Sequence, residues 1–396
     1  MTPNDRPSSA RAAEILRAAI SAVEANGIPA ATGSDAAALA GTLQRIAAAC
    51  PGELAVSVRP AVPLSPADTP LHQAVPPHPH PAHTETAHAD PAHAGAAHTG
   101  TATGPSGTNS APAASSPTNS ARMGTDTDPA DTSSAPAPPS PTGTAHTHLS
   151  DPGHSDTGAV SGGSLTGEEV FAALAWNEDV EMPLASVGKL LLLAEVARGV
   201  DGGTLDPEEP VRLHEDDYCG GSGLLTGLSA RTWTVGDLAL LTAAVSDNTA
   251  TNALLRHVGL DRVNAGARAL GLTRTRLLDR IREPRGPEHP PAFAVGTARE
   301  LAGLVAGAAG WQRVMRGWML ANTDHGLVPA LVRHDPEGRR LANKTGTDDG
   351  VRSDAGIIGS VAYAVLACGP AGSDAGLARA VRQAGALVIA ASGTLP

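Results

Sequence analysis

One long stretch of the chain has a composition that cannot form a packed core. Residues 60–163 consist mainly of Pro, Ala, Ser, Thr, Gly and His, and they contain few large apolar side chains. Such a segment buries too little apolar surface to offset the conformational entropy that it would lose on ordering. We therefore expect 60–163 to be a disordered insert, and we expect folded structure only on either side of it.

Histidine recurs at every fifth position within part of this insert. The histidines concerned are His78, His83, His88, His93 and His98. A histidine-rich tract can bind metal, but a five-residue spacing does not place the imidazoles on one helix face. We therefore favour a low-complexity repeat over a metal-binding tract, and we expect neither a metal nor another cofactor.

The sequence before the insert has the periodicity of folded structure. Residues 1–33 form an N-terminal extension, in which the spacing of apolar residues predicts a helix over 9–26. A second helix is predicted over 34–49, and the alternation in 53–59 predicts a strand.

Beyond the insert, the pattern predicts a strand, then helices, then strands, then a helix. The segments expected to be helical are a long helix from Ser186 and the ranges 234–257, 297–309, 311–321 and 373–392. The segments expected to be strands are 168–176, 351–358 and 362–367. If the insert is a loop between two adjacent strands, 34–59 and 164–396 form a single α/β domain.

Charge and apolar content exclude several classes of partner. The chain has 28 basic and 40 acidic residues, for a formal charge of −12, which argues against binding to nucleic acid. No apolar run, 190–194 included, approaches the roughly 20 residues that are needed to cross a membrane. The N-terminus has no basic segment followed by an apolar one, so we expect a cytoplasmic protein. Three cysteines are too few for a disulfide framework.

Only two of the basic residues are lysines, Lys189 and Lys344. The bias towards arginine suggests a GC-rich genome, in which lysine codons are rare. A lysine that persists in such a sequence is one that arginine cannot replace, because lysine can lose its proton and acts as a compact point charge. Both lysines are therefore candidate functional residues.

The first candidate motif is Ser186-Val187-Gly188-Lys189, at the predicted start of a helix. A serine and a lysine three residues apart lie on one helix face. A serine hydroxyl is a poor nucleophile until a base removes its proton, and a lysine whose pKa is depressed by burial can be that base. The alternative interpretation is a helix cap followed by a solvated lysine.

Two further motifs follow along the chain. In Ser246-Asp247-Asn248, the hydroxyl can relay a proton and the amide can hold a substrate carbonyl, although Ser and Asp are also common helix caps. In Lys344-Thr345-Gly346, the ammonium can bind a substrate carboxylate, and the glycine permits close approach of a ligand.

Taken together and in this order, S-x-x-K, S-D-N and K-T-G resemble the penicillin-recognising serine hydrolases, and class A β-lactamases most closely. The resemblance covers about 34–59 and 164–393. It implies a three-layer α/β/α sandwich with a mainly antiparallel five-stranded sheet, plus an all-helical subdomain that holds Ser246 and Asn248.

The resemblance also implies a role for each motif residue. Ser186 would be the acylated nucleophile and Lys189 its base, and Ser246 would pass a proton to the leaving nitrogen. Asn248 would hold the amide side chain of the substrate. The carboxylate of the substrate would bind to Lys344 and Thr345, and the backbone N–H groups of Ser186 and Thr347 would form an oxyanion hole.

The omega loop departs from the family pattern L-D-R-W-E-P-x-L-N, whose glutamate activates the deacylating water. Here the loop contains Arg282-Glu283-Pro284. An ungapped match places Arg282 at the glutamate position, whereas one inserted residue places Glu283 there. After K-T-G, Arg352 and Asp354 also differ from the usual class A arrangement.

The leading hypothesis is a monomeric hydrolase that opens a β-lactam through a Ser186 acyl-enzyme. A second is an esterase, amidase or peptidase on the same scaffold, acting on a small-molecule amide or ester. A third is a penicillin-binding or sensing protein that acylates and turns over slowly, and a fourth is a metal chaperone that uses the histidine tract.

Overall fold

The computed structural model describes residues 36–65, 68, 167–332 and 341–392, and all of them fall in one compact unit. Several sequence predictions concern residues outside this part of the chain. These are the N-terminal extension over 1–33 with its helix at 9–26, and positions 69–163 of the expected insert, which include the histidine tract.

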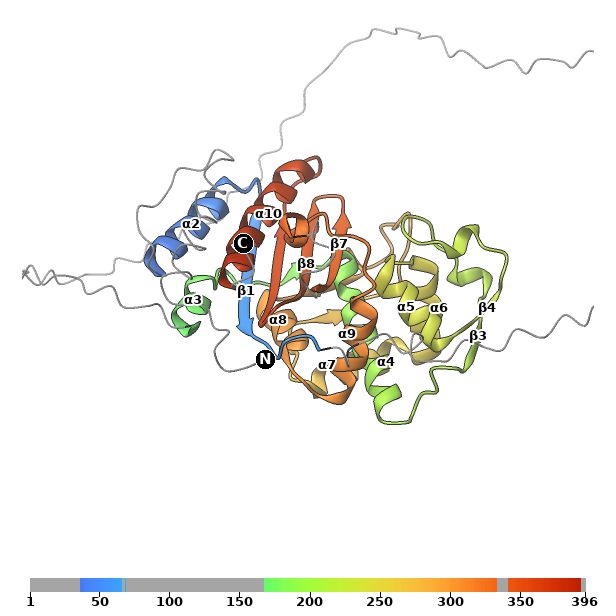
Figure 1. Ribbon diagram of the computed structural model, residues 1–396. Helices are drawn as coiled ribbons and strands as arrows, with labels where there is room; N and C mark the ends of the chain where they lie inside the picture. Colours follow the sequence, from blue (N-terminus) through green and yellow to red (C-terminus); the bar gives the residue numbers. More distant parts are fainter. Residues whose placement is uncertain (1–35, 66–67, 69–166, 333–340, 393–396) are drawn as a thin grey trace, which may run out of the picture. The chain divides into compact units, whose positions relative to one another are not determined.

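The main sheet contains four antiparallel strands in the order β1-β9-β8-β7. They are β1 (Glu53–Pro60), β7 (Leu341–Asp348), β8 (Val351–Ile358) and β9 (Val361–Cys368). The strand that precedes the insert thus pairs along its whole length with the last strand of the chain (Figure 1). The strands predicted over 53–59, 351–358 and 362–367 are confirmed.

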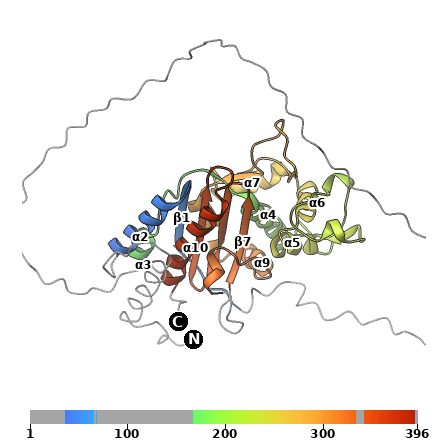
Figure 2. The same cartoon turned by 90° about the horizontal axis from the view of Figure 1, so that it is seen from above.

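Helices cover both faces of this sheet, which makes three layers. On one face α2 (Ala36–Ala49) packs against α10 (Asp374–Ala391), as Figure 2 shows. On the other face lies α8 (Ala298–Ala306). Alternate residues of β9 enter the two cores, Tyr363 on the side of α10 and Ala364 on the side of α8, as expected for a strand whose side chains alternate between faces. The three-layer prediction is confirmed.

A helical region adjoins the sheet on the side of β7 (Figure 1). Its helices are α4 (Lys189–Asp201), α5 (Val235–Ala244), α6 (Asn248–Val258), α7 (Leu260–Ala269) and α9 (Gly310–Met319). The predicted helices at 34–49, 234–257, 297–309, 311–321 and 373–392 are confirmed, whereas α7 was not predicted. Among the described helices, none is both long and apolar enough to span a bilayer.

Short strands form two smaller sheets that the sequence did not predict. One has the order β2-β6-β5, and the other pairs β3 with β4. Their bounds are β2 (Met182–Pro183), β3 (Pro210–Arg212), β4 (Thr232–Thr234), β5 (Arg276–Leu277) and β6 (Ala294–Gly296).

The predicted strand at 168–176 is wrong. This segment begins with a helix, α3 (Gly167–Ala173), and only Trp176 pairs with β1, through a bridge to Val56. Two glutamates in the first turn favour a helix N-terminus, and Val170, Ala173 and Leu174 recur at the three- to four-residue spacing of a helix that packs on one side. The main sheet therefore has four strands in the described part of the chain rather than the five expected.

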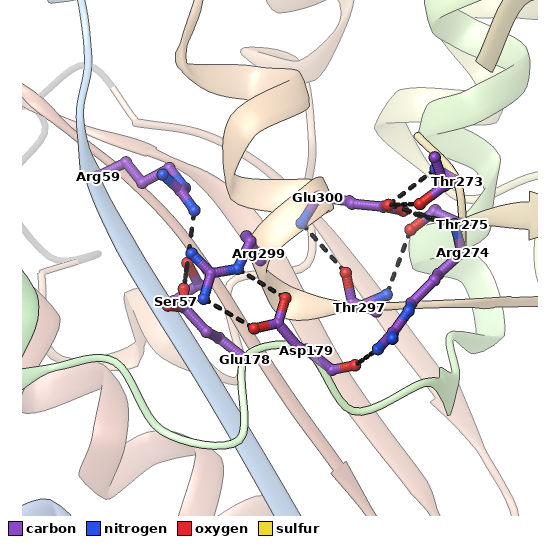
Figure 3. Close-up of polar contacts among 10 residues, drawn as sticks. All are labelled: Ser57, Arg59, Glu178, Asp179, Thr273, Arg274, Thr275, Thr297, Arg299 and Glu300. Atoms are coloured by element: carbon purple, nitrogen blue, oxygen red, sulfur yellow. Dashed lines mark hydrogen bonds and ion pairs between the residues drawn. The ribbon is translucent and has the colours of Figure 1, made fainter. Parts of the chain in front are cut away.

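Ion pairs and hydrogen bonds join the segment that leads from α3 towards Ser186 to β1 and α8 (Figure 3). Glu178 accepts a hydrogen bond from Ser57 on β1 (2.7 Å), and Arg299 at the start of α8 contacts both Glu178 (2.7 Å) and Asp179 (2.6 Å). The main-chain oxygen of Asp179 also accepts a hydrogen bond from Arg274 (2.5 Å). The approach to the first motif is thereby tied to the sheet and to α8.

Candidate active site

The first motif lies on a tight turn at the start of a helix, as the sequence predicts. Ser186 belongs to a 3₁₀ turn, Ala185–Gly188, which runs directly into α4 at Lys189. Residues i and i+3 eclipse each other in a 3₁₀ turn, so Ser186 and Lys189 share one side of it. Ala185 has a φ of 46°, a left-handed conformation that is costly for alanine and typical of active-site turns.

Strand β7 approaches this turn very closely at Gly346. A Cβ on Gly346 would lie 2.5 Å from the Leu184 oxygen and 2.9 Å from the Val187 nitrogen, so no larger residue fits without movement. The Ser353 hydroxyl on β8 donates to the same Leu184 oxygen (2.7 Å). The close approach that Gly346 permits is therefore to the protein's own turn, at Leu184 and Val187.

Lys189 has no exposed surface and points into the helical region. Its Nζ donates to the Ser246 main-chain oxygen (2.6 Å), to Ser246 Oγ (3.0 Å) and to Asn248 Oδ1 (2.8 Å). Burial, and secondly the charge of Lys344, hold the pKa of Lys189 well below its ordinary value. The structure thus brings the first two motifs together around one ammonium group.

The second motif forms the connection between α5 and α6. Ser246 has a φ of 55°, and Asp247 caps α6 by accepting from the Ala250 N–H (2.8 Å). Asp247 also accepts from the N–H groups of Leu224 (2.6 Å) and Leu225 (2.9 Å). The capping interpretation therefore holds for Asp247, whereas Ser246 and Asn248 face Lys189.

The loop at 220–223 was missed by the sequence analysis. Asn248 Nδ2 donates to the Gly220 oxygen (2.6 Å), and the Asn248 N–H donates to the Ser222 oxygen (3.0 Å). Gly221 has a φ of 86°, and a Cβ there would lie 3.0 Å from Asn248 Nδ2 and 3.6 Å from Glu283 Oε2. The run Gly220-Gly221-Ser222-Gly223 was the available signal, because glycine permits such close passage.

The two candidate residues of the omega loop have different surroundings. The Arg282 guanidinium is held within the loop by Asp279 (2.7 Å), and this hydrogen bond raises the pKa of Arg282. The Glu283 carboxylate instead lies next to Gly221 and on the same side of it as Asn248 Nδ2. Of the two alternatives, it is Glu283 whose carboxylate stands near the second motif.

An asparagine on α6 anchors this loop, and the sequence analysis assigned it no role. Asn252 donates to the Ile281 oxygen (3.0 Å) and accepts from the Ile281 N–H (2.8 Å). Further along the same helix, Arg256 pairs with Asp217 (2.8 Å). Asn248, Asn252 and Arg256 recur at four-residue spacing, which puts polar side chains on one helix face and was the signal available.

The third motif is less open to a ligand than the resemblance implies. Lys344 has no exposed surface, and its Nζ donates to the Thr345 oxygen (2.8 Å). Burial lowers its pKa to about 8, although Asp324 and Asp354 act in the opposite direction. The Thr345 hydroxyl donates to Asp324 Oδ2 (2.8 Å), so both side chains already have partners within the protein.

Asp354 is one of the two residues after K-T-G that differ from the usual class A arrangement, and the structure shows what it contacts. It lies opposite Thr345 in the β7–β8 register and is fully buried. Its carboxylate accepts from Tyr363 Oη (3.0 Å), Asn343 Nδ2 (3.1 Å) and the Val328 N–H (3.2 Å). Burial raises its pKa to about 7.

A cavity of about 1370 Å³ joins these elements. Among the residues that line it are Ser186, Gly221, Asn248, Glu283 and Thr347. Lys344 and Thr345 are not part of its lining; of the strand β7, the exposed end from Thr347 onwards faces the cavity. Of the predicted site residues, four line this cavity: Ser186, Asn248, Glu283 and Thr347. Lys189, Ser246 and the three residues of K-T-G do not line it.

The chain is similar to several solved structures. A β-lactamase from Sphaerobacter thermophilus is 29% identical, with a TM-score of 0.51 over 56% of this chain and 87% of that one. PBP-A is 23% identical (TM-score 0.48; 54% of this chain, 83% of that chain), and an ancestral class A β-lactamase is 24% identical (TM-score 0.47; 54% and 87%).

The sequence model of the beta-lactamase enzyme family matches residues 154–391, which is more than half of the chain. The matched region includes the turn at Ser186, the α5–α6 connection, the omega loop and strand β7. The chain therefore belongs to the beta-lactamase enzyme family.

Proposed function

We propose that the protein is a serine hydrolase that opens a β-lactam, or a related small amide or ester, through an acyl-enzyme on Ser186. The observation that carries the proposal is the state of Lys189. Its ammonium is fully buried, and its three hydrogen-bond partners are neutral oxygens. A depressed pKa makes the neutral amine accessible, and only the neutral amine can accept a proton from serine.

In the proposed acylation, Ser186 Oγ attacks the carbonyl carbon and its proton passes to Lys189. The backbone N–H groups of Ser186 and Thr347 stabilise the oxyanion that forms, a contribution often worth about 100-fold or more. As the C–N bond breaks, Ser246 gives its proton to the leaving nitrogen and regains one from Lys189, to which it is hydrogen-bonded.

In the proposed deacylation, Glu283 takes a proton from water and the water oxygen attacks the ester carbonyl carbon. The C–O bond to Ser186 then breaks as the proton is returned to Ser186 Oγ. Asn248 Nδ2 carries two hydrogens, of which Gly220 accepts one. The second hydrogen is assigned to the amide side chain of the substrate.

Intact-mass measurement tests this proposal. The wild type and Ser186→Ala are incubated with a penicillin, and each is sampled after a short and a long interval. We expect the wild type to gain the mass of the penicillin and then to lose it, while Ser186→Ala gains none. Labelling of Ser186→Ala would remove Ser186 from its role. A label that persists in the wild type would contradict turnover and favour a slow-turnover sensor.

A further inference from the structure

The hydroxyl of Thr345 already holds a carboxylate that belongs to the protein. Thr345 Oγ1 donates to Asp324 Oδ2 at 2.8 Å. Thr345 itself is only 4% exposed, whereas Asp324 is exposed. The side of Thr345 that a ligand could approach therefore carries a negative charge before any ligand arrives.

Asp324 does not line the cavity, but its contacts place it next to residues of the candidate site. Its neighbour Thr323 donates to the Ala244 oxygen (2.9 Å), just before Ser246 in the α5–α6 connection. Thr345 and Thr347 lie two residues apart on β7, so their side chains point to the same face, and Thr347 lines the cavity. Asp324 thus lies between the second motif and the strand of the third.

The carboxylate of Asp324 is fixed by contacts on both of its oxygens. Oδ1 accepts from the Gly326 N–H (3.0 Å) while Oδ2 accepts from Thr345. The backbone is held as well, because the Asp324 N–H donates to Asn322 Oδ1 (3.2 Å) and the Asp324 oxygen accepts from Asn322 Nδ2 (2.9 Å). A substrate group cannot displace this carboxylate without breaking several hydrogen bonds.

Two cations lie on the strands that pair at Thr345, Lys344 on β7 and Arg352 on β8, and each already interacts with a group of the protein. Lys344 is buried with its Nζ on a main-chain oxygen, and the charges of Asp324 and Asp354 act on it. Arg352 pairs with Asp374 (2.9 Å). A substrate carboxylate beside Thr345 would be repelled by the like charge of Asp324. Neither Lys344 nor Arg352 is free to offset that repulsion.

We propose that Asp324 is a specificity-determining residue that excludes an anionic group from the position beside Thr345. The substrate class that follows is amides or esters, β-lactams included, whose group at this position is uncharged or cationic. The inference rests on the proposed function, because it concerns substrates of the same Ser186 acylation.

Two probes with one β-lactam core test the proposal: penicillin G, which carries a carboxylate, and its methyl ester, which does not. The acylation rate of the wild type, Asp324→Asn and Asp349→Asn is measured with each by intact mass. Asp349 is the matched control, since it is an exposed carboxylate at the cavity that does not contact Thr345.

We expect the wild type to react faster with the methyl ester. Asp324→Asn should raise the rate with penicillin G by about tenfold, because a like charge is removed, and should change the rate with the ester little. Asp349→Asn should leave the ratio of the two rates within about threefold of wild type, because the carboxylate of Asp349 does not contact Thr345 and solvent screens it.

A measurement on the wild type alone keeps the proposal testable if Asp324→Asn does not fold. Added salt screens charge repulsion, so it should speed acylation by penicillin G and leave the methyl ester unaffected. A wild type that prefers penicillin G, or a rate with penicillin G that salt does not raise, overturns the inference alone. Failure of both probes to label wild type and Asp324→Asn overturns the proposed function and the inference with it.

Discussion

Lys189 and Lys344 are buried to the same extent, but the two sides of the site place different groups around them. On the helical side, Lys189 is bonded to a main-chain oxygen, a hydroxyl and an amide, and the charges of Lys344 and Asp247 act on its pKa in opposite directions. On the sheet side, the carboxylates of Asp324 and Asp354 act on Lys344. The pKa of Lys189 lies well below its ordinary value, while that of Lys344 is lowered to about 8.

The comparison shows that burial lowers the pKa of both lysines and that the neighbouring groups decide what each lysine can do. A buried amine among neutral oxygens can take up and release a proton, which suits a general base. An ammonium near carboxylates is held in its charged form, which suits a fixed charge within the sheet.

The largest expected effect comes from replacing each lysine with methionine, which has a similar length and no charge. Lys189→Met should slow acylation by penicillin methyl ester by about 10²–10⁴-fold, because the proposed base is lost. Lys344→Met should slow it by less than about tenfold, since the proposed acylation passes no proton through Lys344 and the methyl ester has no carboxylate for an ammonium to bind. Quenched time courses, read by intact mass, give the acylation rate of each variant. An equal loss of rate in Lys189→Met and Lys344→Met would mean that the two roles are not distinct.

A smaller effect is expected at the omega loop. Glu283→Gln should leave acylation unchanged and slow deacylation by about 100-fold, because glutamine cannot take a proton from water. Arg282→Gln is the control, since its guanidinium is held by Asp279, and should change deacylation only a few-fold. The decay of the acyl-enzyme is followed by mass, and identical curves for wild type and Glu283→Gln would refute the assignment.

A third prediction compares two asparagines whose side-chain amides each hydrogen-bond to both the N–H and the carbonyl of one loop or strand residue. Asn252 bonds both main-chain groups of Ile281, and Asn264 bonds both main-chain groups of Leu277 (2.9 Å each). Each change to alanine should cost about 1–3 kcal/mol of unfolding free energy. Only Asn252→Ala should also slow deacylation, by about tenfold, because only Ile281 lies next to Arg282 and Glu283. Denaturant melts and mass time courses check this, and slow deacylation in both variants would count against a specific anchor.

The smallest effect concerns stability against pH on the sheet side. The pKa of Asp354 is raised by burial to about 7 in the folded protein, above its ordinary value, so between about pH 4 and pH 7 the folded state keeps a proton that the unfolded state has released. The contribution of this group to stability therefore falls as pH rises through that window. The effect of Lys344 lies above about pH 8.

Asp354→Asn removes this titration. The Tm of the variant minus that of the wild type should therefore become more positive by a few degrees between pH 4.5 and pH 7. Thermal melts of both proteins at the two pH values check it. A difference in Tm that does not change with pH would show that Asp354 titrates in the ordinary range in the folded protein.

Local pattern determined much of the architecture from the sequence. The helices over 34–49 and 373–392 and the strand pair 351–358 and 362–367 were predicted because each has its own periodicity. The same holds for Ser186 and Lys189, which are three residues apart and therefore share one turn. The strand predicted at 168–176 was wrong because a short apolar run fits both periods, and packing against α2 and β1 favours the helix.

Only the tertiary structure decided what each motif residue touches. The placement of Glu283 near Gly221, the partners of Lys189 and the carboxylate on Thr345 all join residues that lie far apart in the chain. Such contacts leave no periodic trace in the sequence, because they depend on how whole helices and strands pack. The sequence by itself therefore indicated which side chains we propose to carry the chemistry. The packing of the helical region against the sheet decided which of them line the cavity and which are buried away from it.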